Sequence, residues 1–423
     1  MATENKKHIP ALRFPEFQND GEWKIVLLKD FTERIKSKVG NAQLRPISIS
    51  AGIGFVDQKN KFGRDISGNQ YSNYIVLKKG EFAYNKGNSI KYPQGCVYQL
   101  KEFEIVACPN VFVCFRIINN SVCPDFMSAY FASNYHGKQL QQYITSGVRS
   151  NGLLNISAET FLGIKTPLPS PAEQKKIADC LSSLDKYIDA TKRQLELLKE
   201  HKKGLMQRLF PAKGKTTPKL RFSEFQNDGE WRRCTMNEIF SRITRKNTIN
   251  NQNVLTISAQ YGLISQYEYF NKNVAAADVS NYYLIDKHDF AYNKSRSLGY
   301  PYGAIKPLKM YDQGVVSPLY ICFRIKDDVQ CSNTFFEYYF ESELIHKEIQ
   351  NMAQEGARNH GLLNISTEDF FNKIQIYIPS FVEQKKIADT LLSVDKQISE
   401  YDKKIKALEL HKKGLMQQLF PKL

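Results

Sequence analysis

The feature that most constrains this chain is a repeat that spans it almost from end to end. The segment HKKGLMQRLFP at 201–211 returns as HKKGLMQQLFP at 411–421, with one substitution. PALRFPEFQNDGEW at 10–23 returns as PKLRFSEFQNDGEW at 218–231. Because self-similarity at one long offset marks a duplicated structural unit, the chain is predicted to fold as two copies of one design.

Shorter matches fill the space between these two motifs. EFAYNKGNS returns as DFAYNKSRS, GLLNISAETF as GLLNISTEDF, and EQKKIADCL as EQKKIADTL. The offset moves only from 208 to 210 residues along the chain, so few insertions separate the copies. At 423 residues the chain is also too long for one ordinary core, which favours two globular domains, each followed by a tail.

Each tail is predicted to be one long helix with a coiled-coil seam. Apolar residues recur at alternating steps of four and three residues, which is the heptad pattern sustained for about five heptads. Lysine interrupts the seam at the same place in both copies. The seam positions are Ile177, Leu181, Leu184, Ile188, Thr191, Leu195, Leu198, Lys202, Leu205 and Leu209, and then Ile387, Leu391, Val394, Ile398, Tyr401, Ile405, Leu408, Lys412, Leu415 and Leu419.

Both helices have marked ends. Ser170 with Glu173, and Ser380 with Glu383, form the sequence pattern of a capping box, in which serine accepts a helical N–H and glutamate reaches back. A Phe-Pro pair closes each helix, because proline cannot continue it. A helix of roughly 38 residues is about 57 Å long.

Connectivity then predicts the architecture. The first helix leads away from the first domain towards the second, so a second helix that pairs with it must run back antiparallel. We therefore expect an α+β protein with two tandem α/β domains, joined by two long helices in an antiparallel coiled coil with an internal pseudo-two-fold. The heads would lie about 50 Å apart at opposite ends. The expected boundaries are 1–166 and 213–376 for the heads, and 167–212 and 377–423 for the helices.

The heads combine strand and helix signals. Stretches such as YICFRI are typical of strands, and each head also has one predicted amphipathic helix. Strand order cannot be derived from these patterns. The apolar residues assigned to the helix are Tyr130, Phe131, Leu140 and Ile144 in the first head, and Phe336, Tyr339, Phe340 and Ile349 in the second.

The charge balance favours a polyanionic partner. The formal net charge is +16, the isoelectric point is near 9.2, and 12% of the residues are aromatic, so basic groups and stacking surfaces occur together. Nucleic acid fits this better than a membrane surface. No run of 18 apolar residues and no signal peptide is visible, so we expect a cytoplasmic location. Eight cysteines occur singly, as expected for reduced thiols, with a zinc site the less favoured alternative.

The copies differ most just after the shared FAYNK motif. A common frame with different loop tips suits two readers of different ligands, although neutral drift of surface loops would give the same divergence. The predicted DNA-binding residues here are Lys86, Asn88, Ser89, Lys91 and Tyr92 in the first copy, and Lys294, Ser295, Arg296, Ser297 and Tyr300 in the second.

A second predicted DNA-binding surface precedes GLLNIS. Each copy has a glycine followed by an arginine two residues later, which presents one cation flanked by amides. Such a group can contact phosphate or the O6 and N7 edge of guanine, whereas the simpler interpretation is a solvated loop charge. The residues are Arg149, Asn151, Arg358 and His360.

Enzyme signatures are absent from the sequence. It contains no glycine-rich phosphate loop, no dinucleotide fingerprint and no Asn-Pro-Pro-aromatic or Asp-Pro-Pro-aromatic methyltransferase box. His201 and His411 lie among lysines on the predicted helices, which is a poor setting for a metal. We therefore predict a recognition protein with no cofactor and no metal. A self-sufficient DNA methyltransferase or nuclease, or a coiled-coil protein scaffold, are the alternatives.

The pattern as a whole resembles the specificity subunit of type I restriction-modification systems. Two variable domains each lead into a helix opening on (L/I)PxxxEQKKIA, with LLNIS upstream and HKKGLMQ(R/Q)LFP at the end. The resemblance implies that each head is a target recognition domain for half of a bipartite double-stranded DNA site, separated by a helical spacer. It also implies two modification subunits that methylate adenine N6 with S-adenosylmethionine, and restriction subunits that can add translocation and cleavage.

The matching helix surfaces would offer two equivalent docking sites to a modification subunit. Glycine costs about 1 kcal/mol inside a helix, so its presence off the seam indicates either close approach of a partner or a bend. The predicted partner-binding residues are Gln174, Lys175, Lys203, Gly204, Gln384, Lys385, Lys413 and Gly414. The target bases themselves cannot be inferred, because the reading loops follow no residue-to-base code.

Overall fold

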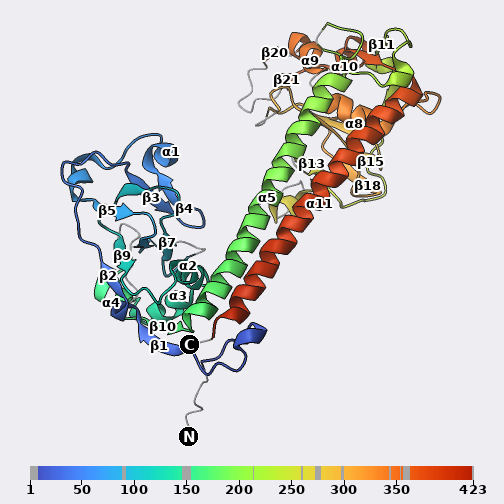
Figure 1. The fold of residues 1–423 in the computed structure, drawn as a ribbon. Coiled ribbons are helices and arrows are strands. Elements are labelled where there is room, and N and C mark those ends of the chain that lie inside the picture. The colour runs from blue at the N-terminus through green and yellow to red at the C-terminus, as the bar shows by residue number, and fades with distance from the viewer. Residues whose placement is uncertain are drawn as a thin grey trace. The chain divides into compact units, whose positions relative to one another are not determined.

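The computed structural model divides the chain into two compact units (Figure 1). Unit 1 comprises Met1–Lys192 and Lys403–Leu423, and unit 2 comprises Arg193–Asp402. Each unit is thus completed by a piece of each long helix. The structure describes residues 8–87, 92–144, 154–212, 214–258, 261–271, 278–296, 300–342, 344–352, 354–355 and 363–421.

Unit 1 is built on a four-stranded antiparallel sheet and three two-stranded ones. The four-stranded sheet has the order β2 (Thr32–Arg34), β9 (Val113–Ile117), β6 (Phe82–Asn85), β7 (Cys96–Gln99). The pairs are β1 (Lys24–Leu27) with β10 (Lys165–Leu168), β3 (Ile47–Ser50) with β4 (Gly54–Asp57), and β5 (Ile75–Lys78) with β8 (Ile105–Cys108). The helices are α1 (Gln58–Phe62), α2 (Pro124–Ala132), α3 (Tyr135–Leu140), α4 (Ala158–Leu162) and α5 (Pro171–Leu209), which continues into unit 2.

Unit 2 repeats the order of the four-stranded sheet and the three two-stranded pairs, and it has one further pair. Its four-stranded sheet has the order β12 (Phe240–Arg242), β19 (Ile321–Ile325), β16 (Phe290–Asn293), β17 (Ala304–Pro307). The pairs are β11 (Arg232–Thr235) with β22 (Gln375–Ile378), β13 (Leu255–Ser258) with β14 (Gly262–Ser265), β15 (Tyr283–Asp286) with β18 (Gln313–Val316), and β20 (Gln354–Glu355) with β21 (Leu363–Asn364). The helices are α6 (Met236–Ile239), α7 (Gln266–Phe270), α8 (Asn333–Glu341), α9 (His346–Met352), α10 (Thr367–Asn372) and α11 (Phe381–Leu419). The predicted duplication and the α+β class are confirmed.

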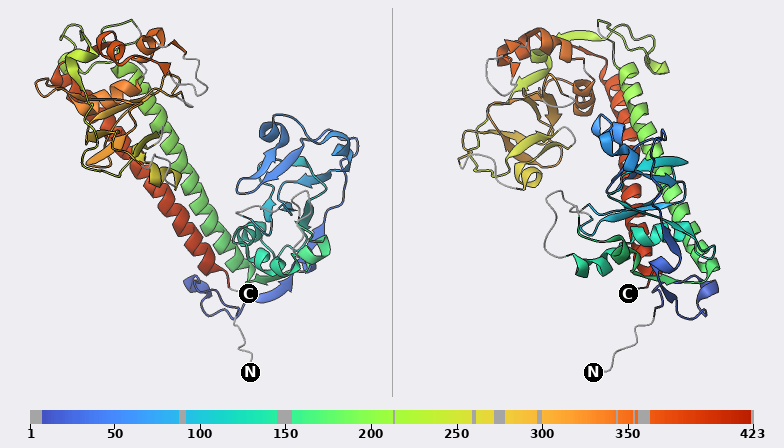
Figure 2. Two further views of the ribbon diagram at one scale, coloured as in Figure 1. Left: turned by 180° about the vertical axis from the view of Figure 1, so that it is seen from behind. Right: turned by 90° about the vertical axis from the view of Figure 1, so that its left-hand side faces the viewer.

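Within each unit, α5 and α11 lie side by side (Figure 2). In unit 1, Lys412 of α11 pairs with Asp185 of α5 at 2.5 Å, and Lys192 pairs with Glu409 at 2.6 Å. Residues in the first part of α5 pair with residues in the last part of α11, so the predicted antiparallel pairing is confirmed. All twenty seam positions are buried or half-buried, as the heptad pattern requires.

The seam lysines have specific partners. In unit 2, the Lys202 ammonium lies 2.7 Å from Asp395, and the Tyr338 hydroxyl donates to the same carboxylate at 2.7 Å. Lys412 and Asp185 make the corresponding pair in unit 1. A lysine that interrupts an apolar seam is tolerated because its charge meets a carboxylate beside the seam.

The predicted capping boxes form only in part. Ser170 Oγ accepts from the Glu173 N–H at 3.4 Å, as expected. Both carboxylate oxygens of Glu173, however, accept from the Arg13 guanidinium at 2.8 and 2.7 Å, and these two side chains are 1% and 8% exposed. The glutamate thus joins the repeated segment at 10–23 to the start of α5. Ser380, Glu383 and Arg221 repeat the arrangement in unit 2.

The repeated Phe-Pro that ends each helix is part of a head core. In unit 1, Phe420 packs against Trp23 at 6.2 Å and Phe126 at 5.3 Å between ring centroids. In unit 2, Phe210 packs against Trp231 at 6.3 Å and Phe335 at 5.6 Å. Strong retention of HKKGLMQxLFP therefore reflects core packing as well as a helix end.

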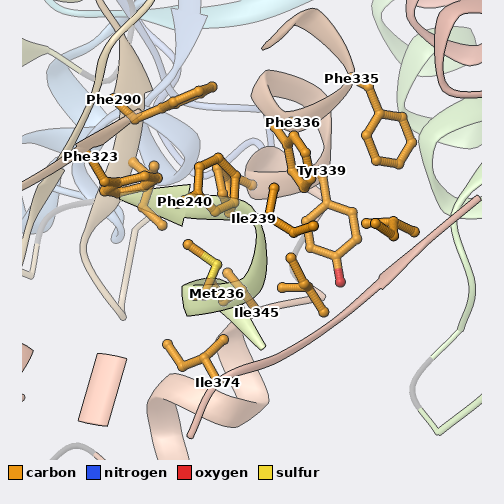
Figure 3. Packing of buried hydrophobic residues seen from close by; sticks show 14 of the residues in the cluster. Met236, Ile239, Phe240, Phe290, Phe323, Phe335, Phe336, Tyr339, Ile345 and Ile374 are labelled. Carbon is orange, nitrogen blue, oxygen red and sulfur yellow. The ribbon is translucent and has the colours of Figure 1, made fainter. Parts of the chain in front are cut away.

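The aromatic core of unit 2 is shown from close by in Figure 3, where Phe336 of α8 lies beside Phe240, with 4.7 Å between ring centroids. Phe290 and Phe323 lie on one side of this pair, and Phe335 and Tyr339 of α8 lie on the other. The prediction of one amphipathic helix per head needs correction here. The predicted helix is divided into two short helices in each head, α2 and α3 in unit 1 and α8 and α9 in unit 2. In unit 1 they are separated at Asn134, whose backbone is left-handed with φ of 57°. All the cysteines are free thiols, as expected. Among the described residues, no helix is long and apolar enough to cross a membrane.

Candidate nucleic-acid interface

The loops predicted to read DNA lie at the ends of two equivalent hairpins, β6–β7 and β16–β17. Both loops leave the first strand in the same way, because an asparagine side chain caps the turn. Asn85 Oδ1 accepts from the Gly87 N–H at 2.8 Å, and Asn293 Oδ1 accepts from the Ser295 N–H at 3.0 Å. The last strand residue of FAYN thus fixes the direction in which each loop departs.

Both loops also return in the same way, through a glycine that nothing else can replace. Gly95 and Gly303 have φ of 80° and 79°, a conformation that glycine adopts freely. A Cβ would lie 2.4 Å from the Asn85 carbonyl oxygen in unit 1 and 2.3 Å from that of Asn293 in unit 2. The glycine of the shared Tyr-Pro-x-Gly motif is therefore required by the base of the hairpin.

Lys86 and Lys294 bind the frame rather than extend into solvent. The Lys86 ammonium donates to the Ile156 carbonyl at 3.3 Å, and the Leu154 N–H donates to the Lys86 carbonyl at 2.9 Å. Lys294 makes the same two contacts in unit 2, with Ile365 and Leu363. Burial lowers the pKa of Lys294. The FAYNK and LLNIS motifs therefore lie side by side, and their lysine ties them together.

The other predicted reading residues divide into two groups. Arg296 is exposed, whereas Ser295, Tyr92 and Tyr300 are half-buried at the two sides of the loops. These four are the other members of the prediction that lie among the described residues. The rest lie outside the described residues: Asn88, Ser89, Lys91, Arg149, Asn151, Ser297, Arg358 and His360.

Sequence reasoning missed one short helix in each unit, α1 in unit 1 and α7 in unit 2. Each follows the second strand of a hairpin, β3–β4 in unit 1 and β13–β14 in unit 2, at equivalent positions. The first copy reads QKNKF and the second QYEYF, so lysines occupy the places of tyrosines. Tyr267 and Tyr269 are 64% and 47% exposed. The signal that could have found them is the same one used for the loops, namely divergence inside a shared frame.

The predicted partner-binding residues are not equally accessible. Gln174 is buried, and its amide accepts from the Cys123 N–H at 2.9 Å and donates to the Pro169 carbonyl at 3.0 Å. Gln384 is bonded in the same way to Ser332 and Pro379. These two glutamines hold each helix start against its head. The exposed members of the set are Lys175, Lys203, Lys385 and Lys413.

Gly204 and Gly414 are half-exposed, and a Cβ at either position would meet nothing within 4 Å. The helices run unbroken through both glycines. Packing inside the unit therefore does not require glycine at these positions.

No cluster of three or more potential metal ligands occurs among the described residues. The expectation of a protein without a metal centre remains a prediction from sequence.

Comparison with known proteins places these features in context. Residues 20–200 match the family of type I restriction modification DNA specificity domains. The MjaVIII type I restriction enzyme specificity subunit of Methanocaldococcus jannaschii is 25% identical over 300 residues, covering 67% of this chain and 68% of that protein. A second protein of the same organism, provisionally named the MjaX specificity subunit, is 24% identical and covers 98% of this chain and 96% of its own. The fold is similar to the crystal structure of a type I system S subunit from M. genitalium, with a TM-score of 0.53, 14% identity and coverage of 98% and 100%.

Proposed function

The chain is a specificity subunit of the type I restriction-modification family, and from this premise we propose that its two units read the two halves of one bipartite double-stranded DNA target. As a specificity subunit it is the DNA-recognition component rather than the catalytic one. The observation that carries the proposal is that two hairpins with identical bases present different residues. The shared base of each hairpin fixes where its loop lies, and the residues at the tip, which differ between the units, select the DNA sequence.

The basic and aromatic groups near the loops support this role. Arg296 is exposed beside the second reading loop, and Lys59 and Lys61 are exposed on α1. Tyr267 and Tyr269 occupy the equivalent places on α7. Guanidinium and ammonium groups contact phosphates and guanine edges, whereas tyrosine supplies apolar and hydroxyl contacts. The two units would therefore approach DNA with different chemistry.

We further propose that each unit docks one modification subunit. In unit 1 the start of α5 and the end of α11 share one core, which brings Lys175 to the same end of the unit as Lys413 and Gly414. In unit 2 the equivalent core joins the start of α11 to the end of α5. Two equivalent composite surfaces suit two copies of one partner. The partner would supply S-adenosylmethionine and the methyl transfer to adenine N6, and restriction subunits would join the same complex in the cytoplasm.

The decisive experiment purifies the chain with its modification subunits and maps methylated adenines by sequencing. We expect one discontinuous target, and we expect replacement of one head by that of another specificity subunit to change only one half of it. A continuous target, or a target unaffected by the replacement, would reject the proposal.

Arg296 offers a sharper test within one unit. We expect Arg296→Ala to weaken recognition by about 1 to 3 kcal/mol at one position in one half-site, because a guanidinium contact with a base edge is lost. The measurement is competition binding with oligonucleotides altered one base at a time, with Lys287→Met as a surface-charge control in the same unit. Equal weakening of all oligonucleotides would assign Arg296 to a phosphate instead.

A further inference from the structure

Hairpins β6–β7 and β16–β17 carry different side chains at one equivalent position of their second strand. In unit 1, β7 carries Tyr98, whose hydroxyl accepts from the Gly52 N–H at 2.8 Å. Its ring also lies close to Gly54, since a Cβ there would be 3.7 Å from the ring carbon Cδ1. One tyrosine thus connects hairpin β6–β7 to hairpin β3–β4.

Unit 2 has Lys306 at the equivalent position of β17. The Lys306 side chain is only 8% exposed and forms an ion pair with Glu341, the last residue of α8. Its ammonium also donates to the Tyr300 hydroxyl at 3.2 Å and lies 5.2 Å from the centroid of the Tyr300 ring. Tyr300 begins the motif through which the reading loop returns to the sheet.

Open space lies beside Lys306 in unit 2. A cavity of about 370 Å³ lies between hairpins β13–β14 and β16–β17, and Tyr261, Gly262, Tyr300, Lys306 and Glu341 are among the residues that line it. The returning side of this loop borders the cavity at Tyr300. It is supported by one charged side chain that contacts both Tyr300 and α8.

A buried ammonium is an unusual support. Burial opposes the charge on Lys306, but Glu341 outweighs it, so that the pKa is raised and the lysine stays charged. Buried ion pairs contribute little net stability compared with apolar packing of similar volume, and their best-attested benefit is a unique geometry. A tyrosine at this position, as in unit 1, would have supported the hairpin without a charge.

We propose that Lys306 is a positioning residue that determines which bases the second unit accepts, by holding Tyr300 against α8 through Glu341. The inference rests on the proposed function, because it concerns the half-site that unit 2 reads. Lys306 acts through Tyr300 rather than by touching DNA itself.

The test compares the partner-assembled complex of the wild-type chain with four variants. Lys306→Met removes the ammonium, Tyr300→Phe removes only its acceptor oxygen, and Lys306→Arg keeps the charge. Lys309→Met is the matched control, because Lys309 follows the same strand and makes an exposed ion pair with Glu337 at 2.9 Å. The readout is the rate of adenine methylation on oligonucleotides with single-base changes in each half-site.

We expect Lys306→Met to lower discrimination about tenfold in one half-site and to leave the other half unchanged, a change comparable to the loss of one base contact. Tyr300→Phe should give a smaller loss of discrimination in the same half-site. This variant still tests the proposal if Lys306→Met folds poorly. Lys306→Arg and Lys309→Met should keep wild-type discrimination.

The two proposals fail in different ways. Wild-type methylation of a continuous target would overturn the bipartite function. A normal bipartite pattern from the wild type, together with unchanged discrimination in both halves for Lys306→Met and Tyr300→Phe, would overturn the role of Lys306 alone. A lower melting temperature with the same target preference would likewise reduce Lys306 to a structural residue.

Discussion

Unit 1 and unit 2 share one set of strands but fill the space around the reading hairpins differently. The base of each hairpin has the same asparagine cap, the same left-handed glycine and the same lysine bound to LLNIS. Away from the base, Tyr98 is exchanged for Lys306, and the lysines of α1 for the tyrosines of α7. The residues that hold the frame are retained, and the residues that surround the tips are free to change.

The comparison separates two kinds of constraint that look alike in the sequence. Lys86 and Lys294 were predicted to contact DNA because they precede the divergent tips, yet their ammonium groups bind carbonyl oxygens of the frame. A retained cation next to a variable loop is therefore a poor guide to the ligand. The variable positions carry more information about what each unit is proposed to bind.

The largest effect on stability is expected when the buried arginine–glutamate ion pair of either unit is broken. Arg13→Met or Arg221→Met leaves a buried glutamate without its partner, and each should cost about 3 to 5 kcal/mol in the free energy of unfolding. Denaturant unfolding measures it. The double variant Arg13→Met with Glu173→Met should recover most of the loss. Unequal losses of unfolding free energy for Arg13→Met and Arg221→Met would show that the two units do not depend equally on this ion pair. A double variant as unstable as the single one would show that the loss does not come from the unpaired glutamate.

A smaller effect is expected at the hairpin base. Gly95→Ala and Gly303→Ala each place a methyl group against a carbonyl oxygen in a left-handed conformation, so each should cost about 3 kcal/mol. Gly80→Ala is the matched control, because its φ is 88° but a Cβ meets nothing within 4 Å. It should cost about 1 kcal/mol, the price of the conformation alone. Equal losses at Gly80 and Gly95 would contradict the clash.

The smallest change in stability is expected when either of the two seam lysines, Lys202 or Lys412, is replaced. Lys202→Met and Lys412→Met should each change the free energy of unfolding by less than about 1 kcal/mol, because methionine suits the seam and the ion pairs are partly solvated. Lys202→Met should be the more costly, since Asp395 is 35% exposed and Asp185 is 50% exposed. Thermal melting of both variants ranks them. A larger loss for Lys412→Met would mean that exposure of the carboxylate does not set the cost.

Much of the architecture follows from the sequence because it depends on local or periodic signals. The duplication, both long helices, the seam with its lysines and the antiparallel pairing were all predicted correctly. Each rests on spacing that can be counted along the chain, such as the steps of four and three from Ile177 to Leu209.

The rest depends on contacts between residues far apart in the chain. The pairing of β2 with β9 and β6, the Arg13–Glu173 ion pair and the packing of Phe420 on Trp23 have no local signature. Glutamate at the third position of a helix reads as half of a capping box, and only the fold shows that an arginine 160 residues earlier takes its carboxylate. Of the candidate site, the positions of the loops were predicted and the supports around them were not.

The insertion of Phe420 into the core of unit 1 affects the order in which the protein can be completed during synthesis. Unit 2 is continuous from Arg193 to Asp402, and Phe210, which fills its core, is made before most of the unit. Unit 1 begins first but lacks Leu419 and Phe420 until nearly all of the chain has left the ribosome. The half that is translated first is thus the half that closes last, and a nonsense codon late in the reading frame would damage the head at the opposite end of the sequence.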